Sequence, residues 1–454
     1  MSAVAALLAA RGLEVSGSDA RAQGLGALRD LGVAVNEGHD AAYVGGAGTV
    51  VVSTAIRETN PELAAARAAG IPVLHRSVAL AALMDGRRAV AVAGAHGKTT
   101  TSAMVAVALA SAGLDPSYAI GGTVLTDAGS HGRSGIGGAH DGRGDVFVAE
   151  ADESDRSFLA YRPDVAVVTN VEPDHLDHYG SREAFEQAFD DFVARVRPGG
   201  RLVACADDAG SSALAERSRA LGIRVLTYGT SAGADVVVGQ WHGPEAGASG
   251  GWTTVHLAAD PGSAVRLDLQ VPGAHNGLNA AAAWTVAHLL GVDGAVAAEG
   301  LAGFVGTGRR FEERGVVRGV RVVDDYAHHP TEVAALLTAA RGVTSGRVLV
   351  LFQPHLFSRT AAFAAQFAQA LGLADAVVVT DVYAAREDPD PAVTGALIAD
   401  QVVPPARFVA DRREAAVALA RVARPGDLLL TVGAGDVTEL APLVLATLGE
   451  GPAE

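Results

Sequence analysis

The sequence predicts an α/β protein of three domains, on the basis of three observations. Short β-branched runs alternate with Ala- and Leu-rich helical stretches throughout the chain. This alternation starts afresh twice, near residue 86 and near residue 307. The length of 454 residues is ample for several domains, each with its own core. We therefore expect domains over 1–85, 86–306 and 307–454, of which the first and the last are Rossmann-like.

The first predicted domain begins in an unusual way. Its opening segment, 2–11, is typical of a helix, whereas a dinucleotide-type α/β domain begins with a strand and a glycine-rich turn. Its strand-like runs are 13–19, 49–56 and 71–76. We therefore expect an N-terminal Rossmann-like domain that lacks its first strand.

The second and third predicted domains are richer in strands. In the second domain the strand-like runs are 89–94, 145–152, 165–170, 201–208 and 224–229. The polar, glycine-rich segment 230–270 that follows them suits an antiparallel hairpin region. In the third domain the runs are 321–330, 347–355, 376–383 and 427–435. Between the two domains, Gly-Thr-Gly at 306–308 is a candidate hinge.

Composition excludes several classes of protein. A formal net charge of −16, with no long basic run, argues against nucleic acid as the main partner. The single cysteine, Cys205, excludes an internal disulfide framework and a multi-cysteine metal site. The sequence has neither a run of about eighteen apolar residues nor the basic start of a signal peptide. We expect a cytoplasmic protein with no membrane partner, acting as a monomer or a weak homodimer.

The stretch AVAVAGAHGKTTTSAM, residues 89–104, contains Lys98, the only lysine in the chain. An apolar strand runs into a glycine-containing turn, and a threonine-rich helix follows it. Glycines let backbone N–H groups approach an oxyanion, and the helix N-terminus adds positive potential. A lysine here reaches terminal phosphates as a point charge, which the rigid fork of an arginine does less well. Thr99 is placed to bind Mg²⁺.

This stretch predicts a central P-loop ATPase-type domain. The usual spacing would place a further glycine five residues before Gly97, where Val92 stands, so the loop is a shortened variant. An ordinary strand–turn–helix with a stray lysine is the alternative. The residues expected at the nucleotide are Gly94, Ala95, His96, Gly97, Lys98, Thr99 and Thr100.

An acidic stretch, VAEADESD at 148–155, follows another strand. Carboxylates at this density suit a hard cation such as Mg²⁺, because the C-terminal ends of adjacent parallel strands meet at one edge of a sheet. Glu150 is the first choice for a metal ligand and His175, in NVEPDHLDHYG, is the second; Asp177 lies in the same stretch. A solvated acidic loop is the alternative.

Polar residues elsewhere also follow secondary-structure signals. Asn276 and Asn279 lie one helical turn apart in PGAHNGLNAAAAW, where an amide can bind an adenine edge or simply cap the helix. In the third domain each strand is followed by a polar cluster, and ligands of open parallel sheets bind at that edge. The clusters contain Asp324, Asp325, His328, His329, Gln353, His355, Arg359, Asp381, Tyr383, Arg386, Gly433, Gly435 and Asp436. Arg310, just before them, is a candidate phosphate ligand.

Taken together, these stretches resemble the Mur ligase family of ATP-dependent amide-forming enzymes. The resemblance is carried by GAHGKTTT, EADESDRSF, NVEPDHLDHYG, GAHNGLNAAAA, GRRFEERG, DDYAHHPTEV and FQPHLFSRT, and it spans nearly the whole chain. It is greatest for the branch that adds L-alanine to UDP-N-acetylmuramate. It implies that ATP phosphorylates the lactyl carboxylate, that the amine of L-alanine attacks the acyl phosphate, and that the cofactors are ATP and Mg²⁺. This would be a step of peptidoglycan precursor synthesis.

The resemblance also implies roles for individual residues. Thr99, Glu150 and His175 would serve the metals, Asn276 would contact adenine beside Asn279, and Asp325 and Arg310 would reach the nucleotide. The residues implied in catalysis are Lys98, His328, His355, Arg359 and Arg310. A neutral histidine such as His355 is suited to take the ammonium proton of alanine. The residues expected to bind the substrates are Ser18, Asp19, Ser53, Ala55, Asp152, Ser154, Tyr326 and His329.

The sequence departs from the family pattern in two places. Because Lys98 is the only lysine, the carbamylated lysine that some members use as a metal ligand is excluded. Family members open with a strand and a loop like GIGGAGMS, which is expected to cradle the diphosphate of the UDP-sugar, and Met1-Ser2 matches only the end of it. We expect a misassigned start codon; the alternative is a truncated protein that is impaired in UDP-sugar binding. The alternatives are the murein tripeptide recycling ligase, a polyglutamate-type ligase and a nucleotide-binding regulatory protein. The recycling ligase typically has an aromatic residue where Ser154 stands.

Overall fold

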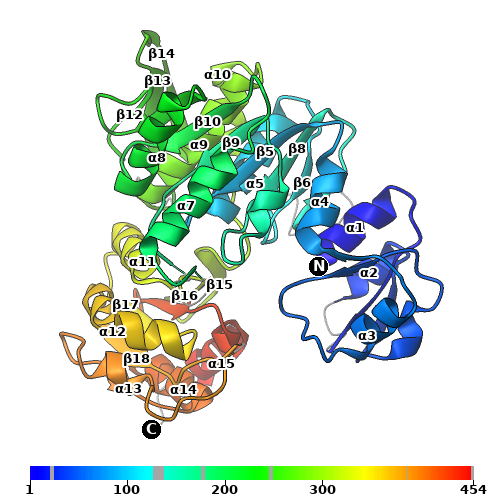
Figure 1. The fold of residues 1–454 in the computed structure, drawn as a ribbon. Coiled ribbons are helices and arrows are strands. Elements are labelled where there is room, and N and C mark those ends of the chain that lie inside the picture. Colours follow the sequence, from blue (N-terminus) through cyan, green and yellow to red (C-terminus); the bar gives the residue numbers. More distant parts are fainter. Residues whose placement is uncertain (21–24, 126–136, 175–178, 245–248, 386, 451–454) are drawn as a thin grey trace. The chain divides into compact units, whose positions relative to one another are not determined.

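The computed structural model describes residues 1–20, 25–125, 137–174, 179–244, 249–385 and 387–450. The chain forms two compact units. The first unit comprises Met1–Gln240, Thr253–Asp268 and Gly277–Val305, and the second comprises Trp241–Trp252, Leu269–Asn276 and Gly306–Glu454. Both units are α/β, as predicted (Figure 1).

The largest element of the fold is a ten-stranded sheet. Its spatial order is β14-β13-β12-β11-β10-β9-β5-β8-β6-β7. The strands are β5 (Arg88–Ala93), β6 (Ser117–Ala119), β7 (Ala139–His140), β8 (Val146–Glu150), β9 (Val165–Val168), β10 (Arg201–Cys205), β11 (Arg224–Gly229), β12 (Val236–Val238), β13 (Gly251–Leu257) and β14 (Asp260–Leu269). Neighbouring strands pair in parallel from β12 through β11, β10, β9, β5 and β8 to β6. Strands β12 and β13 pair antiparallel, in the segment predicted to hold a hairpin.

Burial on both faces explains why the central strand β5 is an unbroken apolar run. Residues 89–93 are fully buried. Ala89, Ala91 and Ala93 share a core cluster with Phe185, Phe189 and Phe192, which lie on α7 (Arg182–Val193). Helix α5 (Lys98–Ser111) packs against β5, β8 and α10 (Gly294–Ala302). Because β8 and β9 flank β5 in parallel, the three following loops emerge at one edge.

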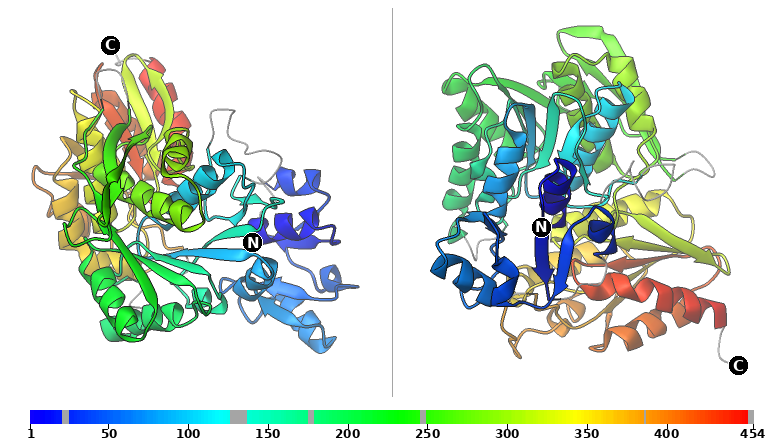
Figure 2. Two further views of the ribbon diagram at one scale, coloured as in Figure 1. Left: turned by 90° about the horizontal axis from the view of Figure 1, so that it is seen from above. Right: turned by 90° about the vertical axis from the view of Figure 1, so that its right-hand side faces the viewer.

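The N-terminal segment of the first unit contains two small parallel sheets. Strand β1 (Ser16–Asp19) pairs with β2 (Ala34–Glu37), and β3 (Val50–Val52) pairs with β4 (Val73–His75). The β1–β2 pair is visible in dark blue in the right-hand view of Figure 2. The helices here are α1 (Ser2–Ala10), α2 (Gly26–Asp30), α3 (Pro61–Ala68) and α4 (Arg76–Met84), with a 3₁₀ turn at Ala41–Val44. The strands are shorter than the predicted runs 13–19, 49–56 and 71–76: β1 begins only at Ser16, a turn follows β3 within its run, and α4 begins directly after β4.

The second unit contains a six-stranded sheet in the order β15-β16-β20-β17-β18-β19. The strands are β15 (Glu312–Val317), β16 (Val320–Asp325), β17 (Val348–Phe352), β18 (Ala376–Val379), β19 (Arg407–Phe408) and β20 (Leu428–Val432). Only β15 runs antiparallel to its neighbour. Alternate residues of β17 enter different cores. Val350 and Phe352 pack with α11 (Pro330–Gly342) and α12 (Phe357–Leu371), and Leu349 and Leu351 pack with α14 (Arg412–Val422) and α15 (Ala441–Glu450).

The remaining helices lie between the strands along the chain or follow the last of them. They are α8 (Ala209–Ala220), α9 (Ala274–Leu289), α11 (Pro330–Gly342), α12 (Phe357–Leu371), α13 (Ala396–Ala399), α14 (Arg412–Val422) and α15 (Ala441–Glu450), with 3₁₀ turns at Ser157–Ala160 and Asp436–Leu440. Among the helices formed by described residues, none combines the length and the apolar character needed to cross a bilayer.

Candidate active site

The loop after β5 has a backbone path that glycine alone accommodates easily. Gly94 has φ +136°, and a Cβ built on it would lie 2.1 Å from Thr169 Oγ1. Gly97, the N-cap of α5, has φ +79°. Both conformations are in the region that L side chains rarely adopt. Glycine at these two positions therefore lets the loop pass close to the strand ends and turn directly into the helix.

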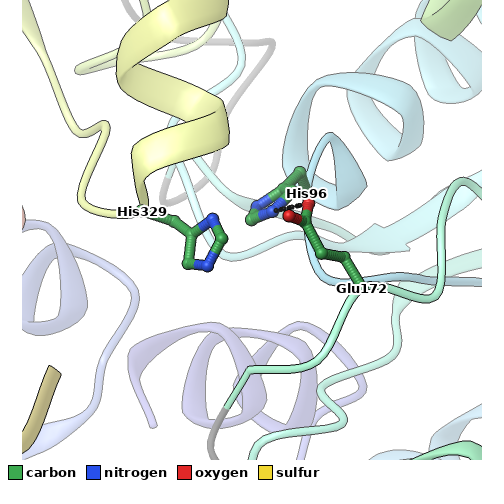
Figure 3. Close-up of side chains that lie close together, drawn as sticks. All are labelled: His96, Glu172 and His329. Carbon is green, nitrogen blue, oxygen red and sulfur yellow. Dashed lines mark hydrogen bonds and ion pairs between the residues drawn. The ribbon is translucent and has the colours of Figure 1, made fainter. Parts of the chain in front are cut away.

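Residues that follow β9 hold this loop in place. The His96 N–H donates to Asn170 Oδ1 at 2.9 Å. The His96 carbonyl accepts from Thr169 Oγ1 at 2.6 Å and from Asn170 Nδ2 at 3.0 Å. The imidazole of His96 lies beside the carboxylate of Glu172, with Nε2 and Oε2 3.0 Å apart (Figure 3). The loop is therefore held at both its backbone and its histidine side chain.

Lys98 begins α5 and points back into the loop. Its Nζ donates to the Gly94 carbonyl at 2.6 Å, to the Ala95 carbonyl at 3.2 Å and to Glu153 Oε1 at 2.9 Å. The Glu153 side chain is only 1% exposed. Burial disfavours the ammonium, but the carboxylates of Glu153, Asp152 and Glu150 outweigh it and raise the pKa of Lys98. Lys98 is therefore a fixed positive charge at the helix N-terminus.

Thr99 and Glu150 come together, as the strand order predicted. Thr99 Oγ1 donates to Glu150 Oε1 at 3.1 Å, and the Gly121 N–H donates to Glu150 Oε2 at 2.7 Å. A hydroxyl and a carboxylate are hard oxygen ligands of the kind that Mg²⁺ takes, so this pair beside the glycine loop fits that ion. His175, the second predicted ligand, and Asp177 lie outside the described residues.

Asp152 faces a different partner from that of its neighbour Glu153. Its carboxylate forms an ion pair with Arg76, at the start of α4, and accepts the Ser154 N–H at 3.0 Å. Burial opposes ionisation, but Lys98 and Arg76 outweigh it and hold the pKa of Asp152 at about 2. The predicted substrate residues Asp152 and Ser154 are thus joined to each other and to the N-terminal segment through Arg76.

The substrate residues predicted in the N-terminal segment lie at the ends of β1 and β3. Ser18 Oγ lies 3.0 Å from His39 Nδ1 and donates to Glu62 Oε1. Asp19, the last residue of β1, accepts the Gly38 N–H at its carbonyl at 2.8 Å. Both residues are therefore at the C-terminal edge of the β1–β2 pair.

The second pair of predicted residues in this segment frames a turn. The Ser53 carbonyl accepts the Ile56 N–H at 3.0 Å, and Ala55 lies inside that turn. The side chain that leaves the turn toward the acidic stretch is that of Thr54, whose Oγ1 donates to Asp155 Oδ2 at 3.0 Å. The predicted residues Ser53 and Ala55 are thus the two neighbours of Thr54, which was not itself predicted.

The two predicted adenine residues on α9 have separate surroundings. Asn276 is buried, and its Nδ2 donates to the Pro272 carbonyl at 2.7 Å. Asn279 accepts from Thr101 Oγ1 at 3.2 Å and lies against Gly97, where an added Cβ would be 2.7 Å from its Oδ1. Asn279 thus packs against the end of the glycine loop at Gly97. Thr100, which is also expected at the nucleotide, is buried in α5.

In the second unit, Arg310 lies in a loop with unusual backbone geometry. Its neighbours Arg309 and Phe311 have φ +60° and +48°. Asp325 Oδ2 accepts the Phe311 N–H and Oδ1 the Ala327 N–H, both at 2.7 Å. Burial raises the pKa of Asp325 to about 6, although Arg310 opposes the shift. Asp325, predicted to touch the nucleotide, therefore holds the loop that presents Arg310.

The Arg309 side chain anchors the same loop to the sheet. It donates to the Gly433 carbonyl at 2.6 Å and to buried Asp324 Oδ2 at 3.3 Å. The Tyr326 ring lies under both guanidinium groups, 4.8 Å from Arg309 Cζ and 5.2 Å from Arg310 Cζ. Arg310 also donates to Glu332 at 3.4 Å.

The histidines predicted in catalysis come together. The His328 and His355 rings are 5.9 Å apart, and His355 stacks on Tyr383 at 5.8 Å. Arg359, which is buried, has Nη1 3.4 Å from His355 Nδ1. His328 Nδ1 lies 3.2 Å from Glu332 Oε2. The ends of β16, β17 and β18 thus converge, as the polar clusters in the sequence indicated.

His329, predicted to bind substrate, also has a structural role. It is buried, it is the N-cap of α11, and its Nδ1 accepts the Thr331 N–H at 3.4 Å. Gln353 bridges Asp436, at 2.8 Å, and the Val437 N–H, at 3.0 Å. Arg386, from the third polar cluster, lies outside the described residues.

Several residues of the site were missed by sequence analysis. They are Thr54, Arg76, Glu153, Thr169, Asn170, Arg309 and Glu332. Thr169 and Asn170 could have been found from the sequence, because they directly follow the strand β9, just as Glu150 stands at the end of the strand β8. For Arg76 no local signal existed, because its partner Asp152 is 76 residues away.

Comparison with protein families gives three matches along the chain. Residues 1–88 match the model described as Mur ligase family, catalytic domain. Residues 92–287 match the Mur ligase middle domain, and residues 309–435 match the Mur ligase, glutamate ligase domain.

Individual relatives are similar over almost their whole length. The UDP-N-acetylmuramate–L-alanine ligase of Kineococcus radiotolerans is 62% identical over 99% of this chain and 94% of its own. That of Renibacterium salmoninarum is 55% identical over 99% and 93%. The solved UDP-N-acetylmuramate–alanine ligase of Thermotoga maritima is 30% identical, with a TM-score of 0.80 over 99% of this chain and 96% of its own. A murein peptide ligase from Psychrobacter arcticus is 25% identical, with a TM-score of 0.71 over 100% and 97%.

Proposed function

Because the chain belongs to the Mur ligase family, we propose that it joins L-alanine to UDP-N-acetylmuramate with conversion of ATP to ADP and phosphate. The observation that carries the proposal is the juxtaposition of Lys98 and Thr99 with Glu150 at the ends of β5 and β8. The substrates are inferred from the names of relatives at 62% and 55% identity. The proposed reaction is a cytoplasmic step of peptidoglycan precursor synthesis.

The proposed chemistry has two stages. The lactyl carboxylate attacks the γ-phosphorus of ATP, the bond to the β-phosphate oxygen breaks, and ADP leaves with that electron pair. The amine of L-alanine then adds to the acyl phosphate, and the tetrahedral intermediate loses phosphate and a proton to give the amide. Lys98 and the loop N–H groups stabilise the charge on the phosphoryl oxygens, where fixed donors contribute most to catalysis.

Further roles fall to a bound Mg²⁺ and to residues of the second unit. Thr99 and Glu150 would hold Mg²⁺, which would neutralise phosphate charge when bound. Arg310, held beside Asp325 and Tyr326, supplies a further positive charge for the phosphates. His328, His355 and Arg359 form the alanine and acyl-phosphate region, with His355 suited to take the ammonium proton. We propose three domains, over residues 1–85, 86–306 and 307–454.

Phosphate release from Mg-ATP tests the proposal. We would measure it with UDP-N-acetylmuramate, L-alanine, glycine, L-serine and an Ala-Glu-diaminopimelate tripeptide, alone and in combination. Release that requires both UDP-N-acetylmuramate and L-alanine is expected. Release with the tripeptide in place of alanine would assign the chain to the recycling reaction, and hydrolysis independent of any acceptor would indicate a nucleotide-binding protein without ligase activity.

A further inference from the structure

The hydrogen-bonding capacity of Lys98 is fully used within the protein. An ammonium group has three N–H donors and no acceptor. Three acceptors surround it: the carbonyls of Gly94 and Ala95, at 2.6 and 3.2 Å, and the carboxylate of Glu153, at 2.9 Å. A phosphate oxygen can therefore receive a hydrogen bond from Lys98 only if one of these acceptors is exchanged or shared.

Of the three acceptors, Glu153 is the one that can be exchanged. The two carbonyls belong to a loop that has little freedom, since the space beside Gly94 is filled by Thr169 and Asn170. Displacing either carbonyl would require movement of the loop backbone. The Glu153 carboxylate stands at the end of a side chain with rotatable bonds, so it can withdraw while its backbone stays in place.

The surroundings of Glu153 favour competition with an anion. The carboxylate is almost completely buried, and both of its oxygens are 2.9 Å from Lys98 Nζ. Its backbone carbonyl is held by the Tyr179 hydroxyl. Burial raises the pKa of Glu153 although Lys98 opposes the shift, and the neighbouring Asp152 adds to the rise. The buried carboxylate thus needs the positive charge of Lys98 beside it. A phosphate that entered the loop would need the same charge.

We propose that Glu153 is a positioning residue that acts through Lys98: it holds the ammonium and competes with nucleotide phosphate for it. Exchange of the Glu153 carboxylate for phosphate then limits how tightly ADP and ATP are held. The inference rests on the proposed use of ATP. It assigns a function to a carboxylate three residues beyond the proposed metal ligand Glu150, in the same acidic stretch.

The test measures the dissociation constant of Mg-ADP by isothermal titration calorimetry, with the full chain and no other substrate. Glu153→Gln keeps the shape and a carbonyl acceptor for Lys98 but removes the competing charge. We expect its dissociation constant to fall by about 5- to 30-fold, the scale of one partly screened charge interaction. The KM for ATP should fall in parallel without a rise in kcat. A purely structural role for Glu153 would instead weaken binding.

A matched control separates this effect from a change in net charge. Glu186→Gln removes one carboxylate from the surface of α7, where Glu186 pairs with Arg182 at 2.6 Å, and should bind Mg-ADP like the wild type. If Glu153→Gln does not fold, Glu153→Asp carries the test, because it withdraws the carboxylate from Lys98 and should also tighten binding, by less.

The outcomes distinguish this inference from the proposed function. If the wild type does not bind Mg-ADP, the proposed function itself is wrong. If the wild type binds Mg-ADP and Glu153→Gln binds it equally or more weakly, only the role assigned to Glu153 is overturned. Equal tightening in Glu186→Gln would also overturn it, because the effect would then come from net charge.

Discussion

Two loops of this chain, one in each unit, hold a cationic side chain where the parallel strands of a mixed sheet end, and they do so differently. The loop that ends at Lys98 reaches positive φ only at Gly94 and Gly97. The loop around Arg310 has positive φ at Arg309 and Phe311, which are not glycines. Left-handed conformations cost a non-glycine residue about 1–2 kcal/mol each, so the second loop carries strain that the first avoids.

The difference follows from what each loop must accommodate. In the first loop a Cβ at Gly94 would collide with Thr169, so the side chain has to be absent. In the second loop the flanking side chains are used: Arg309 binds carbonyls of the sheet, and Phe311 packs at the edge of the core. Hydrogen bonds to Asp325 offset the strain there. Backbone strain is therefore accepted where the side chains themselves support the site.

The largest expected effect comes from changing the cation of the glycine loop. Lys98→Arg keeps the charge but replaces three donors on a flexible stem with a planar fork that cannot reach the Gly94 and Ala95 carbonyls in the same way. We expect kcat for the ligase reaction to fall by about 100- to 1,000-fold. Steady-state kinetics with saturating substrates measure this fall. Wild-type turnover in the variant would refute the role given to Lys98.

The next effect concerns the backbone of the same loop. Gly94→Ala places a Cβ 2.1 Å from Thr169 Oγ1 at φ +136°, so the loop or the end of β9 must move. We expect a loss of about 1–3 kcal/mol in the free energy of unfolding and little remaining Mg-ADP binding. Urea unfolding and calorimetry measure the two. Gly180→Ala, at a positive-φ position with open space, is the control for conformational strain alone.

A smaller effect is expected in the strained loop. Asp325→Asn retains one acceptor for the N–H groups of Phe311 and Ala327 but turns the other oxygen into a donor. The free energy of unfolding should fall by about 1–3 kcal/mol, and kcat/KM for ATP should fall because Arg310 loses its position. Activity equal to that of the wild type would show that Asp325 does not support Arg310.

The smallest expected effect is on the pH dependence of stability, because the pKa values of two carboxylates are shifted in opposite directions. Asp152 has its pKa lowered from 3.8 to about 2, so the stability it contributes is present above pH 3.8 and is lost as the pH falls toward 2. Asp325 has its pKa raised from 3.8 to about 6, so its contribution is greatest below pH 3.8 and declines as the pH rises through 6. Urea unfolding from pH 3 to pH 7 should show the cost of Asp152→Asn rising with pH and that of Asp325→Asn falling. Parallel slopes would contradict this assignment.

Much of the fold and part of the site could be predicted from the sequence, because they depend on local patterns. The apolar run of β5, the glycines after it and the helix that begins at Lys98 are contiguous, so their geometry is set by adjacent residues. The proximity of Thr99 to Glu150 followed from one further rule, that parallel strands end at the same edge. In the second unit the same rule brought His328 and His355 together.

The partners of the individual carboxylates in the acidic stretch could not be predicted from the sequence. Glu150, Asp152 and Glu153 lie within four residues, yet they face Thr99, Arg76 and Lys98 respectively. The direction of each side chain depends on the path of the loop and on partners as far as 76 residues away. Neither periodicity nor composition carries that information. Local sequence patterns were enough to predict that carboxylates lie beside the glycine loop, whereas packing between distant segments sets which of them pairs with Lys98.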